Sequence, residues 1–315
     1  MRAVATNPPA NLIPISTTDK VVVDAIEASG YPLQGVVTEK LLAFGFGAAE
    51  EWGYIDRDTG ENRALDIHAW IDLPPDEVHK IFSSLALLIE CKRSVHPFVF
   101  FKKVTKWQGT GFPAVVNPSR VSLYTDNMSR DVPLSDVLCA GELAFVREPP
   151  LCSVFSRATL SGGNKAELSG DETYKNIVLP LVKAVDYYRE LWSGGSSGGP
   201  LHPKVHLAVC VVNAAMVLVE SPHKLNDPVL IPWVRVERHE AKPRASSQHS
   251  ASHQHYAIDV VHVDYFDAFI RDRLVPFAHE FAQRASERAE VIRKGGVVDN
   301  LDALTWNQPM RPKVR

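Results

Sequence analysis

Two stretches near the N-terminus have the spacing of amphipathic helices. STTDKVVVDAIEASG begins with polar capping residues and ends at Gly30, and YPLQGVVTEKLLAFG has Pro32 at its start, an apolar face and Gly45 near its end. Polar or proline residues at the start and glycine at the end are typical of helices. The pattern therefore predicts a loose lead over residues 1–16, a helix before Gly30 and a second helix from residue 31.

Three strands are predicted next. FGAAEEWGYID is followed by the turn sequence RDTGEN and by RALDIHAWIDL, in which apolar Leu65 and Ile67 alternate with Asp66 and His68. The third strand is LALLIECKRS, residues 85–94, where five apolar residues run into charged ones, which is typical of a buried strand. PPDEVHKIFSS, which precedes it, predicts a short helix, and PFVFF after it is expected to continue the third strand or pair with it.

The rest of the chain also divides into helical and extended patterns. DETYKNIVLPLVKAVDYYRELW predicts a helix that Pro180 bends or divides, and DYFDAFIRDRLVPFAHEFAQRASERAEVIRKGG predicts a long helix with a bend at Pro276 and an end at Gly295. KVHLAVCVVNAAMVLVE predicts strand, tight turn and strand, and WVRVER and YAIDVVHV predict further strands. HEAKPRASSQHSASHQH predicts a mobile polar segment, and RPKVR a disordered tail.

This order of elements predicts an α/β protein with one mixed β-sheet flanked by helices on both faces. The expected division is an N-terminal lead and helix over 1–30, a core over 31–220 with an insertion at 102–170, appended strands and a helix of the same domain over 221–295, and a tail over 296–315. The insertion is rich in Pro, Gly, Ser and Asn, so only short elements are expected there.

Composition removes some classes of protein. The 315 residues carry a net charge of −3, which argues against histone-like nonspecific nucleic-acid binding but leaves room for a local basic groove. The four cysteines are scattered without a CxxC pair, so neither a zinc signature nor a disulfide framework is predicted, and a reducing cytoplasm fits best. The N-terminus lacks the apolar block of a signal peptide, and the most apolar stretch, 205–219, is interrupted by Asn213, so no membrane association is expected.

Charged residues at the ends of two predicted strands form the candidate site. Asp66 lies in one strand, and Glu90 and Lys92 end the next, so the two carboxylates are expected side by side. Two such carboxylates repel unless a cation lies between them, and Mg²⁺ or Mn²⁺ prefers oxygen ligands, to which the Cys91 carbonyl could add. Lys92 could then orient the nucleophile and stabilise negative charge. A purely structural interpretation stays open, in which Glu90 and Lys92 neutralise each other.

The stretch RALDIHAW followed by LLIECKRS resembles the PD-(D/E)xK nuclease superfamily, which has the restriction-endonuclease-like fold. It departs from the motif at one position, because Leu65 and not proline precedes Asp66. The resemblance is clearest over residues 31 to 101. It implies that Asp66 and Glu90 are metal ligands, that Lys92 is catalytic, and that Glu39 of the upstream helix assists. The implied activity is metal-dependent endonuclease cleavage of nucleic acid. The preference for DNA over RNA, and a role in defence or repair, rest on the family alone and not on any residue of this chain. The alternative is a catalytically silent subunit of a larger complex that binds nucleic acid or acts as a scaffold. A protein partner or a homodimer is compatible with both the nuclease and the silent subunit.

Two other groups of residues could form binding sites. FFKKVTKWQGTGF interleaves basic residues, which can contact phosphates, with aromatic residues, which can stack on bases. The candidate nucleic-acid-binding residues are Lys102, Lys103, Lys106 and Trp107. The alternative is that this stretch is the solvated edge of a loop. Histidines cluster in the polar segment and could bind a metal, but the absence of cysteine and the serine-rich context favour an unstructured loop; they are His239, His249, His253 and His255.

Overall fold

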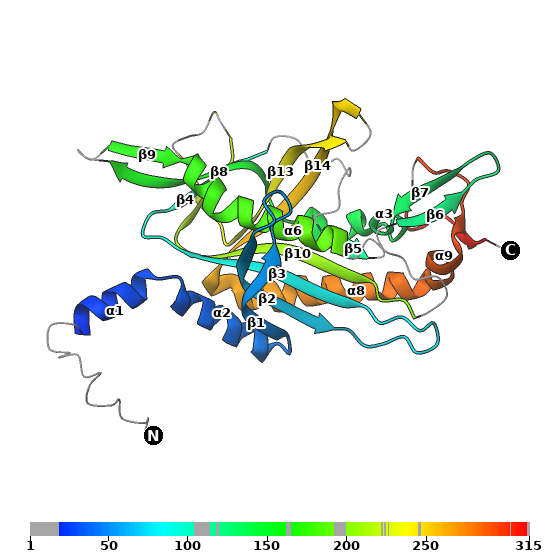
Figure 1. Cartoon of the computed structure of the whole chain (residues 1–315), viewed down its shortest axis with the longest axis horizontal. Coiled ribbons are helices and arrows are strands. Elements are labelled where there is room, and N and C mark those ends of the chain that lie inside the picture. Colours follow the sequence, from blue (N-terminus) through cyan, green and yellow to red (C-terminus); the bar gives the residue numbers. More distant parts are fainter. Residues whose placement is uncertain are drawn as a thin grey trace, which may run out of the picture.

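One large mixed sheet forms the centre of the molecule (Figure 1). The computed structural model describes residues 19–103, 114–117, 120–161, 165–191, 200–221, 223, 225, 227–244, 247–302 and 304–313. The strands of this sheet are β1 (Gly47–Ile55), β2 (Asn62–Asp72), β3 (Ser84–Arg93), β4 (Phe98–Lys102), β5 (Ala114–Asn117), β8 (Leu151–Ser161), β9 (Lys165–Ser169), β10 (Lys204–Asn213), β11 (Met216–Val219), β12 (Val229–Leu230), β13 (Trp233–Arg244) and β14 (Ser247–His262). Their order is β1-β2-β3-β10-β14-β13-β8-β4-β11-β12, with β5 paired to β10 and β9 to β8.

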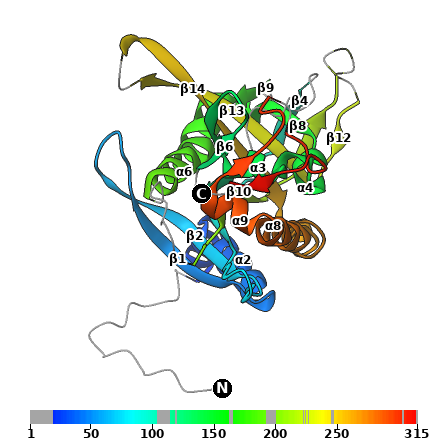
Figure 2. The same cartoon turned by 90° about the vertical axis from the view of Figure 1, so that its right-hand side faces the viewer.

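Helices cover both faces of this sheet, as the sequence predicts. The helices are α1 (Asp19–Ala28), α2 (Tyr31–Ala43), α3 (Leu134–Val137), α4 (Ala144–Arg147), α5 (Gly170–Thr173), α6 (Leu179–Leu191), α7 (Phe266–Phe269), α8 (Val275–Glu287) and α9 (Ala289–Lys294). Figure 2 shows α6 and α8 on opposite sides of β10. The protein is therefore a mixed α/β structure with its sheet between helical layers.

The run of consecutive apolar residues in the sequence forms the central strand β3, which is buried on both faces. Leu87 and Ile89 point into a core with α2 and α8, which we call the α8-side core and which also contains Phe281. Leu88 points the other way, into a core with α6, which we call the α6-side core and which also contains Leu181. Because helices bury both faces of β3, every position in the run is apolar rather than every second one.

The first four neighbouring strands have a simple connectivity. After α2, strands β1, β2 and β3 pair antiparallel in chain order. The chain returns through α6 to β10, which pairs parallel with β3 from Lys204 to Asn213. The parallel arrangement places the C-terminal ends of β3 and β10 at the same edge of the sheet, next to the antiparallel β2.

Two π-helical turns accommodate the prolines for which the sequence predicts a bend. One turn, Tyr174–Val178, comes just before Pro180, and the other, Ile270–Leu274, just before Pro276. Proline lacks the backbone N–H and its ring collides with the carbonyl four residues earlier in a regular α-helix. A π turn is wider, so both helices continue past their prolines.

Two sequence-based predictions of secondary structure were wrong. PPDEVHKIFSS is not a helix but a turn closed by a bridge between Asp76 and Ile81, because the Asp76 carboxylate accepts the backbone N–H of His79 and competes with helix formation. PFVFF forms β4, which pairs with β8 and β11 and not with β3. The predicted strand, turn and strand at 204–219 is confirmed as β10 and β11, and β11 pairs with β4.

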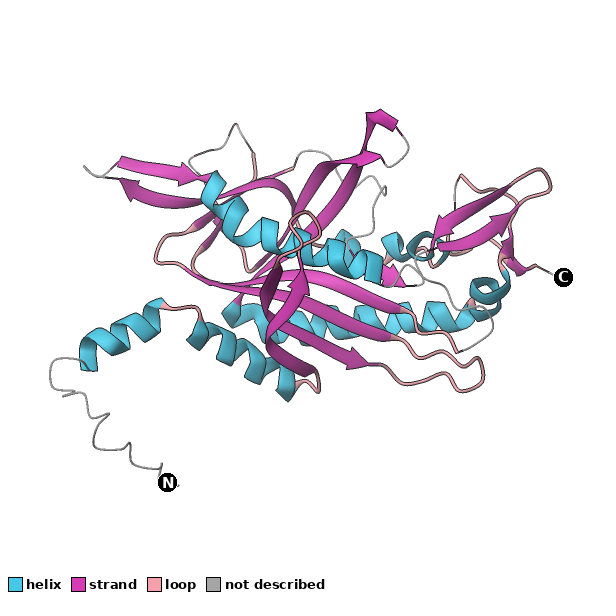
Figure 3. Ribbon diagram, viewed as in Figure 1, coloured by secondary structure: helices cyan, strands magenta, loops and turns pink. Residues whose placement is uncertain are grey.

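The polar segment expected to be mobile is the outer part of a long hairpin (Figure 3). Strands β13 and β14 pair from Trp233 with Val261 out to Pro243 with Ala251. The inner ends of both strands are buried in the core, and backbone hydrogen bonds extend the pairing outward without needing apolar side chains. The RPKVR tail also contains structure, since β16 (Arg311–Pro312) joins a small sheet with β15 (Gly296–Val297), β6 (Arg120–Tyr124) and β7 (Ser129–Pro133).

A buried ion pair joins the two strands of this hairpin in the core. The guanidinium of Arg235 binds the Asp259 carboxylate through two hydrogen bonds of 2.9 and 3.0 Å, and Trp233 donates a further one of 2.9 Å. The Arg235 and Asp259 side chains are only 0% and 2% exposed. Arg235 also donates to the backbone carbonyl of Val146, so its charge is satisfied on several sides.

Replacing Asp259 by asparagine is expected to destabilise the protein strongly. The substitution keeps the shape of the side chain but leaves the Arg235 guanidinium buried without its counter-charge, which costs about 3–5 kcal/mol in comparable cases. Urea unfolding followed by circular dichroism measures the change in the free energy of unfolding. Asp302→Asn, which removes an exposed partner of Arg130, is the control and should change nothing measurable. Equal stability of the two variants would show that the buried pair has no such role.

Candidate active site

The regular geometry of β2 breaks at Asp66. The pairing of β2 with β3 ends at Ile67 with Ile89. Ile67 packs in the α8-side core, whereas Leu65, two residues away, packs in the α6-side core. Residues two apart in a regular strand face the same side, so the strand must twist sharply between them. On the neighbouring strand, Glu51 lies opposite the break and has a φ of 50°, a conformation that is unusual outside glycine.

The break turns the Asp66 side chain toward β3. Its Oδ2 accepts a hydrogen bond of 2.6 Å from the backbone N–H of Cys91. On the next residue, the Lys92 ammonium lies 2.7 Å from Glu90 Oε2 and 3.7 Å from Asp66 Oδ2. The structure therefore brings Asp66, Glu90 and Lys92 together from two adjacent strands, with one ammonium group beside both carboxylates.

Burial makes this group electrostatically unusual. Glu90 is 4% exposed, and its burial, reinforced by the charge of Asp66 and partly offset by Lys92, raises its pKa to about 7. Burial alone would lower the pKa of Lys92, but the carboxylates of Glu90 and Asp66 outweigh it and the pKa is raised. At neutral pH Lys92 is therefore fully charged, while Glu90 is divided between its charged and neutral forms.

Glu39 is not part of the group that the structure brings together. The buried face of α2 consists of Leu33, Gln34, Val37 and Leu41, and Glu39 lies on the opposite, exposed face. The residue of α2 that does reach the site is Gln34, whose Nε2 donates 2.8 Å to the backbone carbonyl of Asp66. The sequence contains a signal for this, because Gln34 is a polar residue within the apolar face of the predicted helix.

Cys91 contributes its backbone and not its thiol. The side chain is buried in the α8-side core, and burial raises the pKa of the thiol. Its backbone N–H supports Asp66, as described above, and its carbonyl oxygen faces Gly30, where an added Cβ would lie 3.8 Å away. The structure therefore places the backbone N–H of Cys91 beside Asp66, whereas its carbonyl as a metal ligand stays a prediction.

Sequence reasoning missed a third carboxylate. Glu51 of β1 is exposed and its charge contributes to the raised pKa of Glu90. It has the strained φ noted above, at the break opposite Asp66. Nothing in the EE dipeptide distinguishes Glu51 from a solvated surface residue, so only the folded sheet reveals its position.

His68 is a packing residue, although it shares a strand with Asp66. Its ring is 6% exposed and stacks on Trp52 and Tyr188, with ring centroids 5.0 and 5.4 Å apart. Neither ring nitrogen has a hydrogen-bond partner among the residues that the structure describes. Burial, with a smaller contribution from Lys204, lowers its pKa to about 4, so the ring is neutral at physiological pH.

Of the four residues proposed to bind nucleic acid, the structure describes only Lys102 and Lys103. Lys102 pairs with Glu220 at 3.3 Å, and Lys103 with Glu237 at 2.5 Å. Lys106 and Trp107 lie outside the described residues. The two described lysines thus already have acidic partners.

A pocket of about 1340 Å³ lies elsewhere in the molecule. Its lining has both signs of charge and includes none of the three residues of the candidate site. The charged residues around it are Lys102, Lys103, Arg130, Arg147, Asp131, Asp136, Glu142, Glu148 and Asp302. This mixture does not have the single positive sign that a groove for nucleic acid requires.

Comparison with known proteins does not identify the chain. No family model, curated protein or solved structure matches it significantly. Among the described parts of the chain, no helix has the length and apolar character needed to cross a membrane.

Replacing Glu90 by glutamine is expected to change how stability depends on pH. The folded state keeps a proton on Glu90 up to about pH 7, whereas the unfolded chain loses it near the ordinary value of 4.5. The stabilising contribution of this proton is present below pH 4.5 and is lost as the pH rises to 7. The wild type should therefore lose up to about 3 kcal/mol relative to Glu90→Gln over this interval.

Urea unfolding without divalent cations, repeated from pH 4 to pH 8, measures this difference. Glu77→Gln, at an exposed position, is the matched control and should follow the wild type throughout. A constant difference between the wild type and Glu90→Gln across the interval would show that Glu90 has no raised pKa.

Proposed function

We propose that the chain is a metal-dependent endonuclease that hydrolyses phosphodiester bonds in nucleic acid, with DNA as the first substrate to test. The observation that carries this proposal is the meeting of Asp66, Glu90 and Lys92 at adjacent strands, with the ammonium 2.7 and 3.7 Å from the two carboxylates. Carboxylates beside a lysine at such a point are the arrangement expected of a PD-(D/E)xK site. A role in defence or repair rests on the same resemblance.

The connectivity of the sheet supports a restriction-endonuclease-like core. The chain passes through α2, the meander β1-β2-β3, α6 and then β10 parallel to β3. This is the order of helix, three strands, helix and strand that the resemblance implies. Strands β14, β13, β8, β4, β11 and β12 extend the sheet beyond β10, and on this proposal they are additions to the core.

The site has the chemistry to hold Mg²⁺ or Mn²⁺. Asp66 and Glu90 would be the ligands, with the Cys91 carbonyl as a further oxygen donor. Burial, with the charge of Asp66, raises the pKa of Glu90 despite the adjacent Lys92, and a divalent cation would favour the charged form of the carboxylate. When bound, such an ion polarises a phosphate and lowers the pKa of a water molecule.

The residues of the chain would do the rest. The backbone N–H of Cys91 and the side chain of Gln34 hold Asp66 from two directions, so its carboxylate is fixed before substrate arrives. Lys92 keeps its proton at neutral pH and can stabilise charge that develops on the phosphate or orient the attacking water. All three reactive side chains lie at one point of the sheet, which favours their acting together.

A catalytically silent binding or scaffold subunit is the second candidate. It is favoured by the direct contact between Lys92 and Glu90, which also suits a structural ion pair, and by the acidic partners of Lys102 and Lys103. A homodimer or protein partner is compatible with both candidates. The four cysteines are free and buried, in keeping with the proposed cytoplasmic location.

The purified full chain is expected to cut nucleic acid only when Mg²⁺ or Mn²⁺ is present. Plasmid, single-stranded DNA and RNA should each be incubated with either metal and with a chelator, and the products separated on gels. Lys92→Ala removes the ammonium that stabilises developing charge and is expected to slow cutting at least about 100-fold. Circular dichroism and thermal unfolding show whether the variant is still folded.

The matched control for this experiment is Lys175→Ala, which removes an exposed lysine from the first π turn and should cut at the wild-type rate. Equal binding of nucleic acid by the wild type and Lys92→Ala, with no cutting under any metal, would reject the nuclease and support the binding subunit. A stable large complex without affinity for nucleic acid would support the scaffold.

A further inference from the structure

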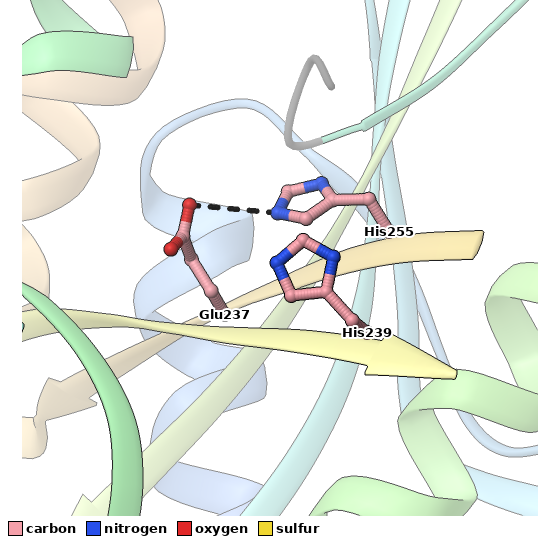
Figure 4. A group of neighbouring side chains, drawn as sticks. All are labelled: Glu237, His239 and His255. Atoms are coloured by element: carbon pink, nitrogen blue, oxygen red, sulfur yellow. Dashed lines mark ion pairs between the residues drawn. The ribbon is translucent and has the colours of Figure 1, made fainter. Parts of the chain in front are cut away.

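Three potential metal ligands meet on the β13–β14 hairpin, far from the candidate active site. Glu237 and His239 are two residues apart on β13 and so share a face, and His255 of β14 is paired with His239 across the hairpin. One ligand atom from each of the three residues lies within 4.8 Å of the others. Figure 4 shows the two imidazole rings beside the Glu237 carboxylate. We propose that Glu237, His239 and His255 bind one divalent transition-metal ion, with Zn²⁺ as the best fit.

The two oxygens of Glu237 have different partners. Oε1 lies 3.5 Å from His255 Nε2, on the side of the imidazoles. Oε2 lies 2.5 Å from the Lys103 ammonium, which comes from the end of β4. One oxygen can therefore bind the ion while Lys103 holds the other and fixes the orientation of the carboxylate, as supporting residues do around established metal centres.

The group is open to solvent on one side. Glu237 is buried, His255 is half-buried and His239 is exposed. An ion can therefore reach the group from solvent past the His239 side chain.

The donor set selects the kind of ion. Two imidazole nitrogens and one carboxylate oxygen suit Zn²⁺ and its neighbours in the first transition row, whereas Mg²⁺ and Ca²⁺ prefer oxygen alone. Around a tetrahedral Zn²⁺ the donor atoms are about 3.3 Å apart, so the separation of 3.5 Å between Glu237 and His255 already fits. Three protein ligands leave the fourth coordination position open to water or another ligand.

This site is separate from the candidate active site. Strands β10 and β14 lie between β3 and β13 in the sheet. The member of the group nearest to β3 is His255 of β14, and β10 lies between these two strands, so at the usual spacing of neighbouring strands the two sites are at least about 10 Å apart. Binding here therefore stands or falls independently of the proposed nuclease activity.

The test uses untagged, metal-free full-length protein. Isothermal titration calorimetry with Zn²⁺, and absorption spectroscopy with Co²⁺ as a coloured substitute, should give one ion per chain. His239→Ala and His255→Ala should each weaken binding at least about tenfold, since even residues that only support metal ligands have effects of this size. Zn²⁺ should also raise the melting temperature of the wild type and not that of the variants.

His239→Ala is the decisive variant, because the side chain is exposed and its removal should leave the fold intact. His279→Ala, at an exposed position on α8, controls for binding by scattered histidines, of which the chain has 12 in total, and should bind like the wild type. Absence of stoichiometric binding, or binding that His239→Ala does not weaken, would overturn the proposal.

Discussion

Burial of the central strands on both faces determines where this protein can place charge. Strands β3 and β10 lie between α8 on one side and α6 on the other, and their interior positions are apolar in both directions except for the buried His206 of β10. An unpaired charge in that interior would cost several kcal/mol. Charged groups therefore either pair completely, as Arg235 and Asp259 do, or gather where the strands end, as Glu90 and Lys92 do. The candidate active site is the second of these outcomes.

Much of the fold could be predicted because the local patterns agree with the tertiary structure. The buried face of α2 follows directly from the side of the helix that packs on the sheet, and the continuous apolar run of β3 from the covering of both its faces. The predictions failed where a single hydrogen bond or a distant partner decides the structure. The Asp76 carboxylate replaces a predicted helix by a turn. Strand β4 was expected to continue or pair with β3, but it pairs with β8 and with β11, which lies more than a hundred residues later in the chain.

The candidate site was predictable in part for a similar reason. Asp66, Glu90 and Lys92 lie on consecutive antiparallel strands, so their sequence positions already indicate that they are neighbours. Glu39 was expected at the site from the family resemblance alone, and Gln34 reaches the site instead because helical phase decides which residue of α2 faces the sheet. His239 and His255 belong to the histidine cluster that the sequence offers as metal ligands. Their meeting with Glu237 could not be predicted, because it depends on the register of a hairpin whose polar strands carry no periodic signal.

The two π turns have a consequence for how the length of this chain can vary. A π turn holds one more residue than the α-helical turn it replaces, while the helix on either side keeps its own phase. A one-residue deletion in Tyr174–Val178 or Ile270–Leu274 would therefore convert the wide turn into an ordinary one without rotating the buried faces beyond it. The proline that follows would then meet the carbonyl of a regular helix. In each helix the extra residue of the π turn and the following proline therefore depend on each other. Removing the extra residue alone would leave the proline in a regular helix that cannot accommodate it.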